Sequence, residues 1–167
     1  MERPPFIISS TDVPEDTHCY PNSDEQMAAG RSISRMAGMK KIGLHYTRVK
    51  PGQRTSYPHA EEREEEFVFV ISGEVDAWID GHLHRMKAGD LAGFPAGTGT
   101  CHAFLNNGSE DAILLVGGER GKSDNRIYYP RNPERQGDMP WNDWWSDIPL
   151  AEQGPHDGVA KRDESPQ

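Results

Sequence analysis

The sequence predicts an all-β fold, a sandwich or barrel of short antiparallel strands. Between residues 42 and 118, seven runs rich in β-branched and aromatic residues alternate with turn signals such as Pro-Gly, Ser-Gly and Asp-Gly. Apolar residues in this region do not recur at the helical period of about 3.6 residues. Short runs at this spacing, bounded by turn residues, are typical of β-sandwiches and barrels. The chain of 167 residues is long enough for one such domain.

The seven predicted strands follow one another without a long interruption. In order they are IGLHYTRV, EFVFVI, EVDAWI, HLHRM, LAGFP, CHAFL and AILLV. The third and fourth runs are joined by Asp80-Gly81, a strong signal for a two-residue hairpin. Because His82 and His84 follow this turn, we expect them to face solvent rather than to form a binding site.

The second run differs from the others because it is apolar on both faces. Val68 and Val70 share one face, whereas Phe67, Phe69 and Ile71 share the other. Such a strand has to be covered on both sides. The barrel interior would cover one side, and the N-terminal arm, the C-terminal segment or a second subunit would cover the other. We expect a homodimer.

Composition divides the remaining chain into parts that flank a barrel core at 42–118. Residues 1–41 are rich in Pro, Ser, Asp and Glu and are expected to form an N-terminal arm. Residues 119–150 are expected to pack on the barrel through three aromatic side chains, Trp141, Trp144 and Trp145. Residues 151–167 have almost no large apolar side chains and are expected to form a flexible tail.

The chain is acidic, with 27 Asp and Glu residues against 18 Lys and Arg and a formal net charge of −9. This balance argues against binding to nucleic acid or to anionic membranes, both of which select clustered basic residues. No apolar run approaches the roughly 20 residues that span a bilayer, and the N-terminus lacks the apolar region of a signal peptide. Cys19 and Cys101 are expected to be free thiols. A cytoplasmic protein is therefore expected.

A dense acidic run, EEREEE at 61–66, directly precedes the most apolar strand. The ordinary interpretation of such a run is a solvated loop. Like charges at this density nevertheless cost free energy unless a positive group compensates them, and a divalent cation is one such group. His59 lies two residues before this run, and His102 begins a later strand. A His and Glu set on neighbouring barrel strands is suited to Fe, Mn, Zn or Ni.

Two motifs in this order resemble those of the cupin superfamily, proteins with a double-stranded β-helix or jelly-roll barrel. The positions that match the first motif are Gly52, His59, Glu66 and Gly73, and those that match the second are Gly89, Pro95, Gly97, His102 and Asn106. The segment FPAGTG and the trailing GERGKSDNRIYYPRNPER are similar to one bacterial and fungal group of cupins. The resemblance implies a cupin barrel with N- and C-terminal arms, and a divalent metal ion held by His59, Glu66 and His102.

Glu61 occupies the position where the first cupin motif has its second His. Three interpretations follow: Glu61 is a fourth metal ligand in an oxygen-richer site, it is a catalytic general base beside the metal, or the site has lost its metal. The resemblance implies a small polar metabolite as substrate, with isomerase, lyase and oxygenase chemistry all open because fold does not determine function. The alternative is a non-catalytic cupin that binds or senses a small molecule through a degenerate metal site.

Overall fold

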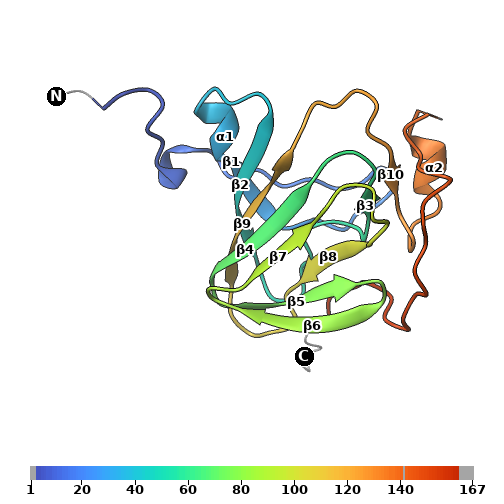
Figure 1. Ribbon diagram of the computed structural model, residues 1–167. Coiled ribbons are helices and arrows are strands. Elements are labelled where there is room, and N and C mark those ends of the chain that lie inside the picture. The colour runs from blue at the N-terminus through green and yellow to red at the C-terminus, as the bar shows by residue number, and fades with distance from the viewer. Residues whose placement is uncertain (1–2, 141, 162–167) are drawn as a thin grey trace.

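Two antiparallel sheets pack face to face to form the barrel (Figure 1). The structure, a computed structural model, describes residues 3–140 and 142–161. The larger sheet has the order β1-β2-β9-β4-β7, with bounds β1 Ala29–Ser32, β2 Ile42–Val49, β9 Ala112–Glu119, β4 Glu66–Ser72 and β7 Leu91–Phe94. The smaller sheet has the order β6-β5-β8, with bounds β6 His82–Lys87, β5 Glu74–Ile79 and β8 His102–Leu105. The predicted all-β class is confirmed, and the seven predicted runs correspond to β2 and β4–β9.

The remaining elements are short. β3 (Ala60–Glu61) pairs with β10 (Ile127–Tyr128), which joins the C-terminal segment to the barrel. The helical elements are the 3-10 turn Ser10–Asp12, α1 (Ile33–Met36) and α2 (Arg135–Asp138). None of the described helices has the length and apolar character needed to cross a membrane.

The main core lies between the two sheets. Val68, Val70 and Leu114 point inward from the larger sheet, and Val75 and Phe104 meet them from the smaller one. All five are at most 4% exposed. Because side chains alternate between the faces of a strand, the same pattern that buries Val68 and Val70 directs their neighbours outward. The core thus fixes which residues of β4 line the barrel interior.

The hairpin between β5 and β6 has the turn that its sequence predicts. Asp80 and Gly81 both have positive φ angles, 46° and 86°. Two consecutive left-handed residues match the twist of an antiparallel hairpin, which explains the Asp-Gly pair. His82 and His84 are exposed at the start of β6, so their predicted position in solvent is confirmed.

The outer face of the larger sheet is apolar and only partly covered. Phe67 and Phe69 are half-buried there, Ile71 is 41% exposed, and Leu91 of β7 is 62% exposed. The C-terminal tryptophans pack in two other clusters: Trp144 contacts the group around Tyr57 and Tyr129, and Trp145 the group around Trp78 and Leu105. Trp141 lies outside the described residues.

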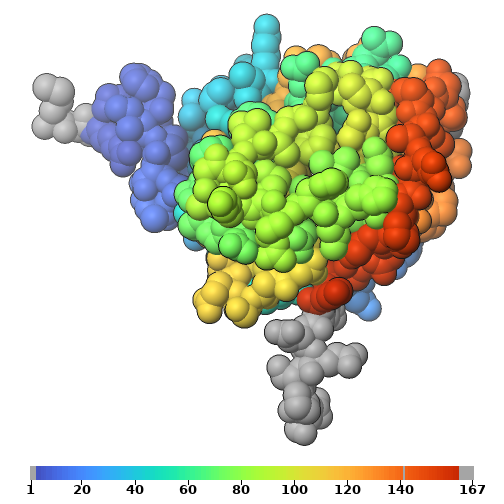
Figure 2. All heavy atoms as spheres, turned by 60° about the horizontal axis from the view of Figure 1, so that its bottom comes forward, coloured from blue at the N-terminus to red at the C-terminus, as the bar shows by residue number. Residues whose placement is uncertain are grey.

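Residues 151–161 of the expected tail lie against the barrel, and residues 162–167 lie outside the described residues. Figure 2 shows this segment, in red, lying along the barrel surface beside the green strands. Trp78 donates a hydrogen bond from Nε1 to the carbonyl of His156 (2.9 Å), and Arg54 donates to the carbonyl of Gly158 (2.6 Å). The segment is therefore fixed by hydrogen bonds to its backbone, which need no apolar side chains.

Candidate metal centre

The barrel brings together three side chains from three different segments. His59, just before β3, and His102, at the start of β8, form an isolated β-bridge in which each backbone N–H donates to the other residue's carbonyl (3.1 and 2.8 Å). Their imidazole rings are therefore neighbours, with centroids 5.0 Å apart. Glu66 approaches them from the larger sheet as the first residue of β4.

One ligand atom from each of these residues lies within 4.8 Å of the other two. Glu66 Oε2 is 3.1 Å from His102 Nε2 and 3.4 Å from His59 Nε2. These are the three residues that the sequence resemblance implies as ligands. Two imidazole nitrogens and a carboxylate converging on one point form a donor set that suits Fe, Mn, Zn or Ni.

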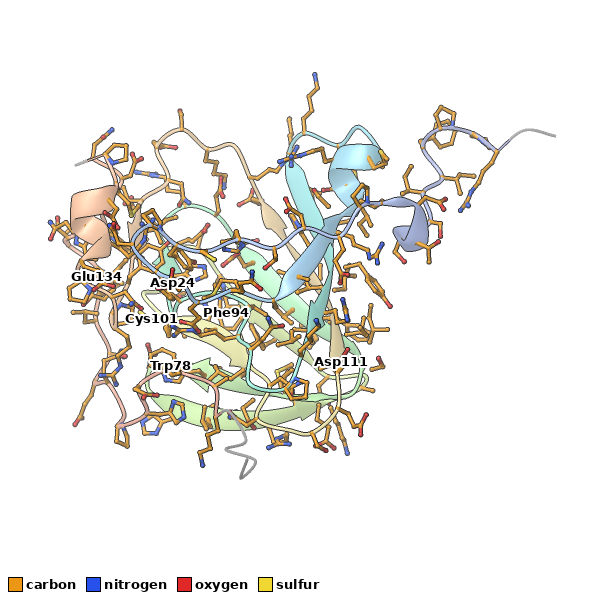
Figure 3. All side chains as sticks on the ribbon, turned by 180° about the vertical axis from the view of Figure 1, so that it is seen from behind. Asp24, Trp78, Phe94, Cys101, Asp111 and Glu134 are labelled. Carbon is orange, nitrogen blue, oxygen red and sulfur yellow. The ribbon has the colours of Figure 1, made fainter. Side chains whose placement is uncertain are left out.

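Both imidazole rings are oriented by backbone carbonyl groups. His59 Nδ1 lies 2.8 Å from the carbonyl oxygen of Tyr57, and His102 Nδ1 lies 3.4 Å from that of Thr100. In the metal-free protein the Nε2 groups face Glu66 as hydrogen-bond donors. A His bound to a metal through Nε2 would keep its proton on Nδ1 and donate it to the carbonyl. Metal-binding histidines commonly have such a partner, which fixes the tautomer and the ring orientation. Phe94, labelled in Figure 3, stacks on the His102 ring at 3.5 Å between centroids.

The three side chains compensate one another electrostatically. Burial alone would lower the pKa of His59, but the hydrogen bond and charge of Glu66 outweigh it and raise this pKa to about 9. Burial would raise the pKa of Glu66, yet hydrogen bonds from both imidazoles hold it well below its usual range. Burial lowers the pKa of His102, and the positive charge on His59 acts in the same direction. A proton on His59 thus balances Glu66, and a metal cation could replace that proton.

Glu61 lies outside this group of three. Its Oε2 accepts a hydrogen bond from Asn125 Nδ2 (3.1 Å), so the carboxylate is held toward the segment that follows β9. Burial and the negative charge of Glu66 raise the pKa of Glu61 to about 7. The immediate space is small, a cavity of about 10 Å³ lined by Glu61, Glu66 and His102 among others. That volume is near the minimum for one water molecule, so this space by itself would hold an ion.

Two other carboxylates of the acidic run, those of Glu62 and Glu64, have partners in residues 119–126. Arg126 forms a bidentate pair with Glu62 (2.7 and 2.9 Å), and the backbone N–H of Lys122 donates to Glu64 (2.9 Å). Within the described chain, only Glu66 of the run belongs to the group of possible metal ligands. The run is therefore partly an anchor for the C-terminal segment.

Sequence reasoning missed the residues that support the three side chains. The carbonyl groups of Tyr57 and Thr100 act through the backbone, which leaves no signal in residue type. Asn125 did have a signal, because it belongs to the trailing segment that accompanies the second motif.

Comparison with known proteins agrees with the cupin resemblance of the sequence. The family model for the cupin domain matches residues 45–118. The chain is 28% identical over 103 residues to the rhicadhesin receptor of Pisum sativum. The matched part is 58% of this chain and 46% of the pea protein, so the chain spans less than half the length of that relative.

Solved structures share the architecture. A candidate sugar phosphate isomerase from Acidithiobacillus ferrooxidans has a TM-score of 0.70 and 23% identity, covering 77% of this chain and 83% of its own. A sugar phosphate isomerase from a cupin superfamily, from Silicibacter pomeroyi, has a TM-score of 0.68 and 27% identity, covering 74% and 80%. The polyketide cyclase RemF from Streptomyces resistomycificus has a TM-score of 0.61 and 20% identity, covering 86% and 96%.

Proposed function

The chain belongs to the cupin superfamily, and on that premise we propose that it binds a divalent metal ion and acts with it on a small polar metabolite. His59, Glu66 and His102 would hold the ion. The observation that carries this proposal is the convergence of two Nε2 atoms and one carboxylate oxygen within 4.8 Å, with both Nδ1 atoms directed at carbonyl groups.

The bound ion would supply Lewis acidity, and a ligand set of two His and one carboxylate leaves further coordination positions for a substrate. The chain's own residues provide three things. The carbonyls of Tyr57 and Thr100 hold the imidazole tautomer, Glu66 supplies negative charge, and Phe94 limits access of water beside His102. Fe, Mn, Zn and Ni all suit these donors.

Glu61 is proposed as the proton-transfer residue beside the ion rather than as a fourth ligand. Its hydrogen bond to Asn125 holds it outside the group of three, and its raised pKa of about 7 would let it both accept and release a proton near neutrality. Among the reaction classes of the fold, isomerisation is favoured by the 27% identity to the isomerase from Silicibacter pomeroyi.

A homodimer is proposed through the apolar outer face of the larger sheet. Two copies stacked on this face would bury Phe69 and Leu91 of each partner in an isologous contact. Arg48 shares the face, but its guanidinium is already paired with Glu15 (2.8 Å), so the two copies would not bring unpaired like charges together.

Equilibrium dialysis of Mn(II), Fe(II), Zn(II) and Ni(II) against chelator-treated protein tests the metal site. We expect about one equivalent of at least one ion and a loss of at least tenfold in affinity for His102→Gln, because one of only three ligands is removed. His82→Gln is the matched control, since His82 is exposed on β6. Binding that is equal in both variants, or no binding in wild type, would refute the proposal and favour the non-catalytic alternative.

A further inference from the structure

A second and larger cavity opens on the inner side of the larger sheet, toward its β1 edge. Its volume is about 640 Å³, and its walls come from β1, β2, β9 and the N-terminal residues 13–18. The N-terminal segment forms one wall because Asp16 pairs with Gly30 of β1. Unlike the small space at the metal ligands, this cavity has the size of a metabolite site.

Three basic side chains lie in or beside this cavity. Arg35 and His45 line it, and Arg120 lies beside His45: a Cβ built on Gly43 would be 3.7 Å from Arg120 Cδ and 4.0 Å from His45 Nε2. The proximity of both arginines contributes to a lowered pKa of His45, for which burial is the largest cause. We call Arg35, His45 and Arg120 the cationic cluster.

The positive charge of this cluster is not neutralised by neighbouring carboxylates. Most arginines of the chain form ion pairs, as Arg54 does with Glu25 and Arg126 with Glu62. Over residues 3–140 and 142–161, by contrast, no carboxylate lies within ion-pair distance of Arg35 or Arg120. The Arg120 guanidinium donates to two backbone carbonyls of the loop before β2. Both arginines therefore act on His45 with a charge that no neighbouring carboxylate of the described chain compensates.

The cavity also holds a buried hydroxyl without a partner. Ser32 lies opposite His45 in the β1–β2 register, and its Oγ has no hydrogen bond within the described chain. Buried polar atoms normally have a partner, so this hydroxyl is available to a ligand. Carboxylates also line the cavity: Glu15 is occupied by Arg48 (2.8 Å), and Asp16 is exposed at the far wall.

A row of paired residues lies between the cationic cluster and the metal ligands. Glu66 pairs with Gly118 of β9, and Gly118 pairs with Gly43 of β2, so these three residues form one row on the inner face. Two inter-strand steps of about 4.8 Å place the backbone of Gly43 about 10 Å from that of Glu66. A Cβ on Gly118 would lie 2.7 Å from the Glu65 carbonyl oxygen and 3.1 Å from Glu66 Cγ, so residues 65 and 66 fill this row and separate the two sites.

We propose that the cationic cluster and the Ser32 hydroxyl form an anion subsite for the carboxylate or phosphate group of a small metabolite bound in this cavity of about 640 Å³. Arginine supplies several N–H donors for either anion, and the hydroxyl of Ser32 and the imidazole of His45 add further donors. The inference rests on the proposed function for the role of the ligand, although the anion subsite itself exists without metal.

Calorimetric titration of chelator-treated protein with inorganic phosphate, and separately with malonate, tests the subsite and distinguishes the two anions. We expect one of them to bind, and Arg35→Gln and Arg120→Gln each to weaken it by about tenfold or more, the effect of losing a charge-assisted hydrogen bond. The side chain of Arg35 makes no hydrogen bond in the described structure, so its replacement should leave folding intact. Gly43→Val should also weaken binding, because its side chain would fill the space between Arg120 and His45.

Arg85→Gln is the matched control. Arg85 lies on β6 of the smaller sheet, and its substitution removes the same positive charge. Equal weakening in Arg85→Gln would indicate unspecific attraction and overturn the proposal, as would unchanged binding in Arg35→Gln and Arg120→Gln or no binding of either anion. Dialysis of Mn(II) against the same variants separates the two sites. Loss of phosphate or malonate binding with metal binding retained supports the subsite, and a chain that binds the anion but no metal refutes the metal proposal alone.

Discussion

Metal binding at the proposed centre should expel a proton. The pKa of His59 is raised to about 9 by its contact with Glu66, so at pH 7 this imidazole carries a proton in the metal-free protein. A metal ion needs the neutral imidazole as ligand, and the incoming cation therefore displaces the proton. Since the metal-free pKa lies about two units above pH 7, almost every molecule is protonated there, and about one proton should be released per ion bound.

The sign of the pH dependence follows from the same competition. Below pH 9 the affinity should rise about tenfold per pH unit, because one proton is lost for each ion bound, and above pH 9 it should level off. Calorimetry of Mn(II) binding in two non-coordinating buffers with different ionisation enthalpies gives the number of protons directly. The Glu61→Gln variant separates any contribution from the neighbouring carboxyl group. Metal binding without proton release at pH 7 in this variant would refute the electrostatic account of His59 and Glu66.

Three further predictions concern stability and assembly. Metal-free protein should lose stability as pH rises from about 6.5 through 9, because folded His59 keeps a proton that the unfolded chain releases; thermal melts of Glu66→Gln should lack this trend. Deletion of residues 151–167 should lower the midpoint of thermal unfolding by several degrees, since Trp78 and Arg54 lose hydrogen-bond partners; an unchanged midpoint would contradict the packed position of this segment. Leu91→Lys should shift the mass measured by light scattering from dimer to monomer, whereas a wild-type monomer would refute the proposed dimer.

The barrel could be predicted because its signals are local. Each of the seven predicted runs is bounded by turn residues, and the structure places a strand at each of them. The strands β1, β3 and β10 could not be predicted in this way. β3 and β10 have two residues each, too few for an alternating pattern. β1 has the sequence Ala-Gly-Arg-Ser, without β-branched or aromatic residues, and it is ordered by pairing with β2.

In the candidate site, too, some residues could be predicted from local sequence and others depend on distant partners. His59, Glu66 and His102 could be identified from motif spacing, and the barrel brings them together as that spacing implies. The position of Glu61 could not be read from the sequence, because it depends on a hydrogen bond to Asn125, which is 64 residues away along the chain. The cationic cluster could not be predicted either, since Arg120 comes near His45 only through the pairing of β9 with β2.

The packed C-terminal segment shows why composition alone misleads. A stretch with few apolar residues is expected to be flexible when burial is the only source of order. Here the order comes from side-chain donors on the barrel that bind backbone carbonyls, such as Arg54 to Gly158. Small residues suit this position, because Gly158 and Ala160 are buried against the barrel where a large side chain would need more room.

Elemental analysis of the full chain, purified without chelators from cells grown in metal-sufficient medium, tests the central claim most directly. The account predicts about one equivalent of Fe, Mn, Zn or Ni per chain in wild type, and a large loss of that metal in Glu66→Gln, which removes the carboxylate between His59 and His102. A wild-type protein that contains none of these metals, or a Glu66→Gln variant that keeps the full amount, would contradict it.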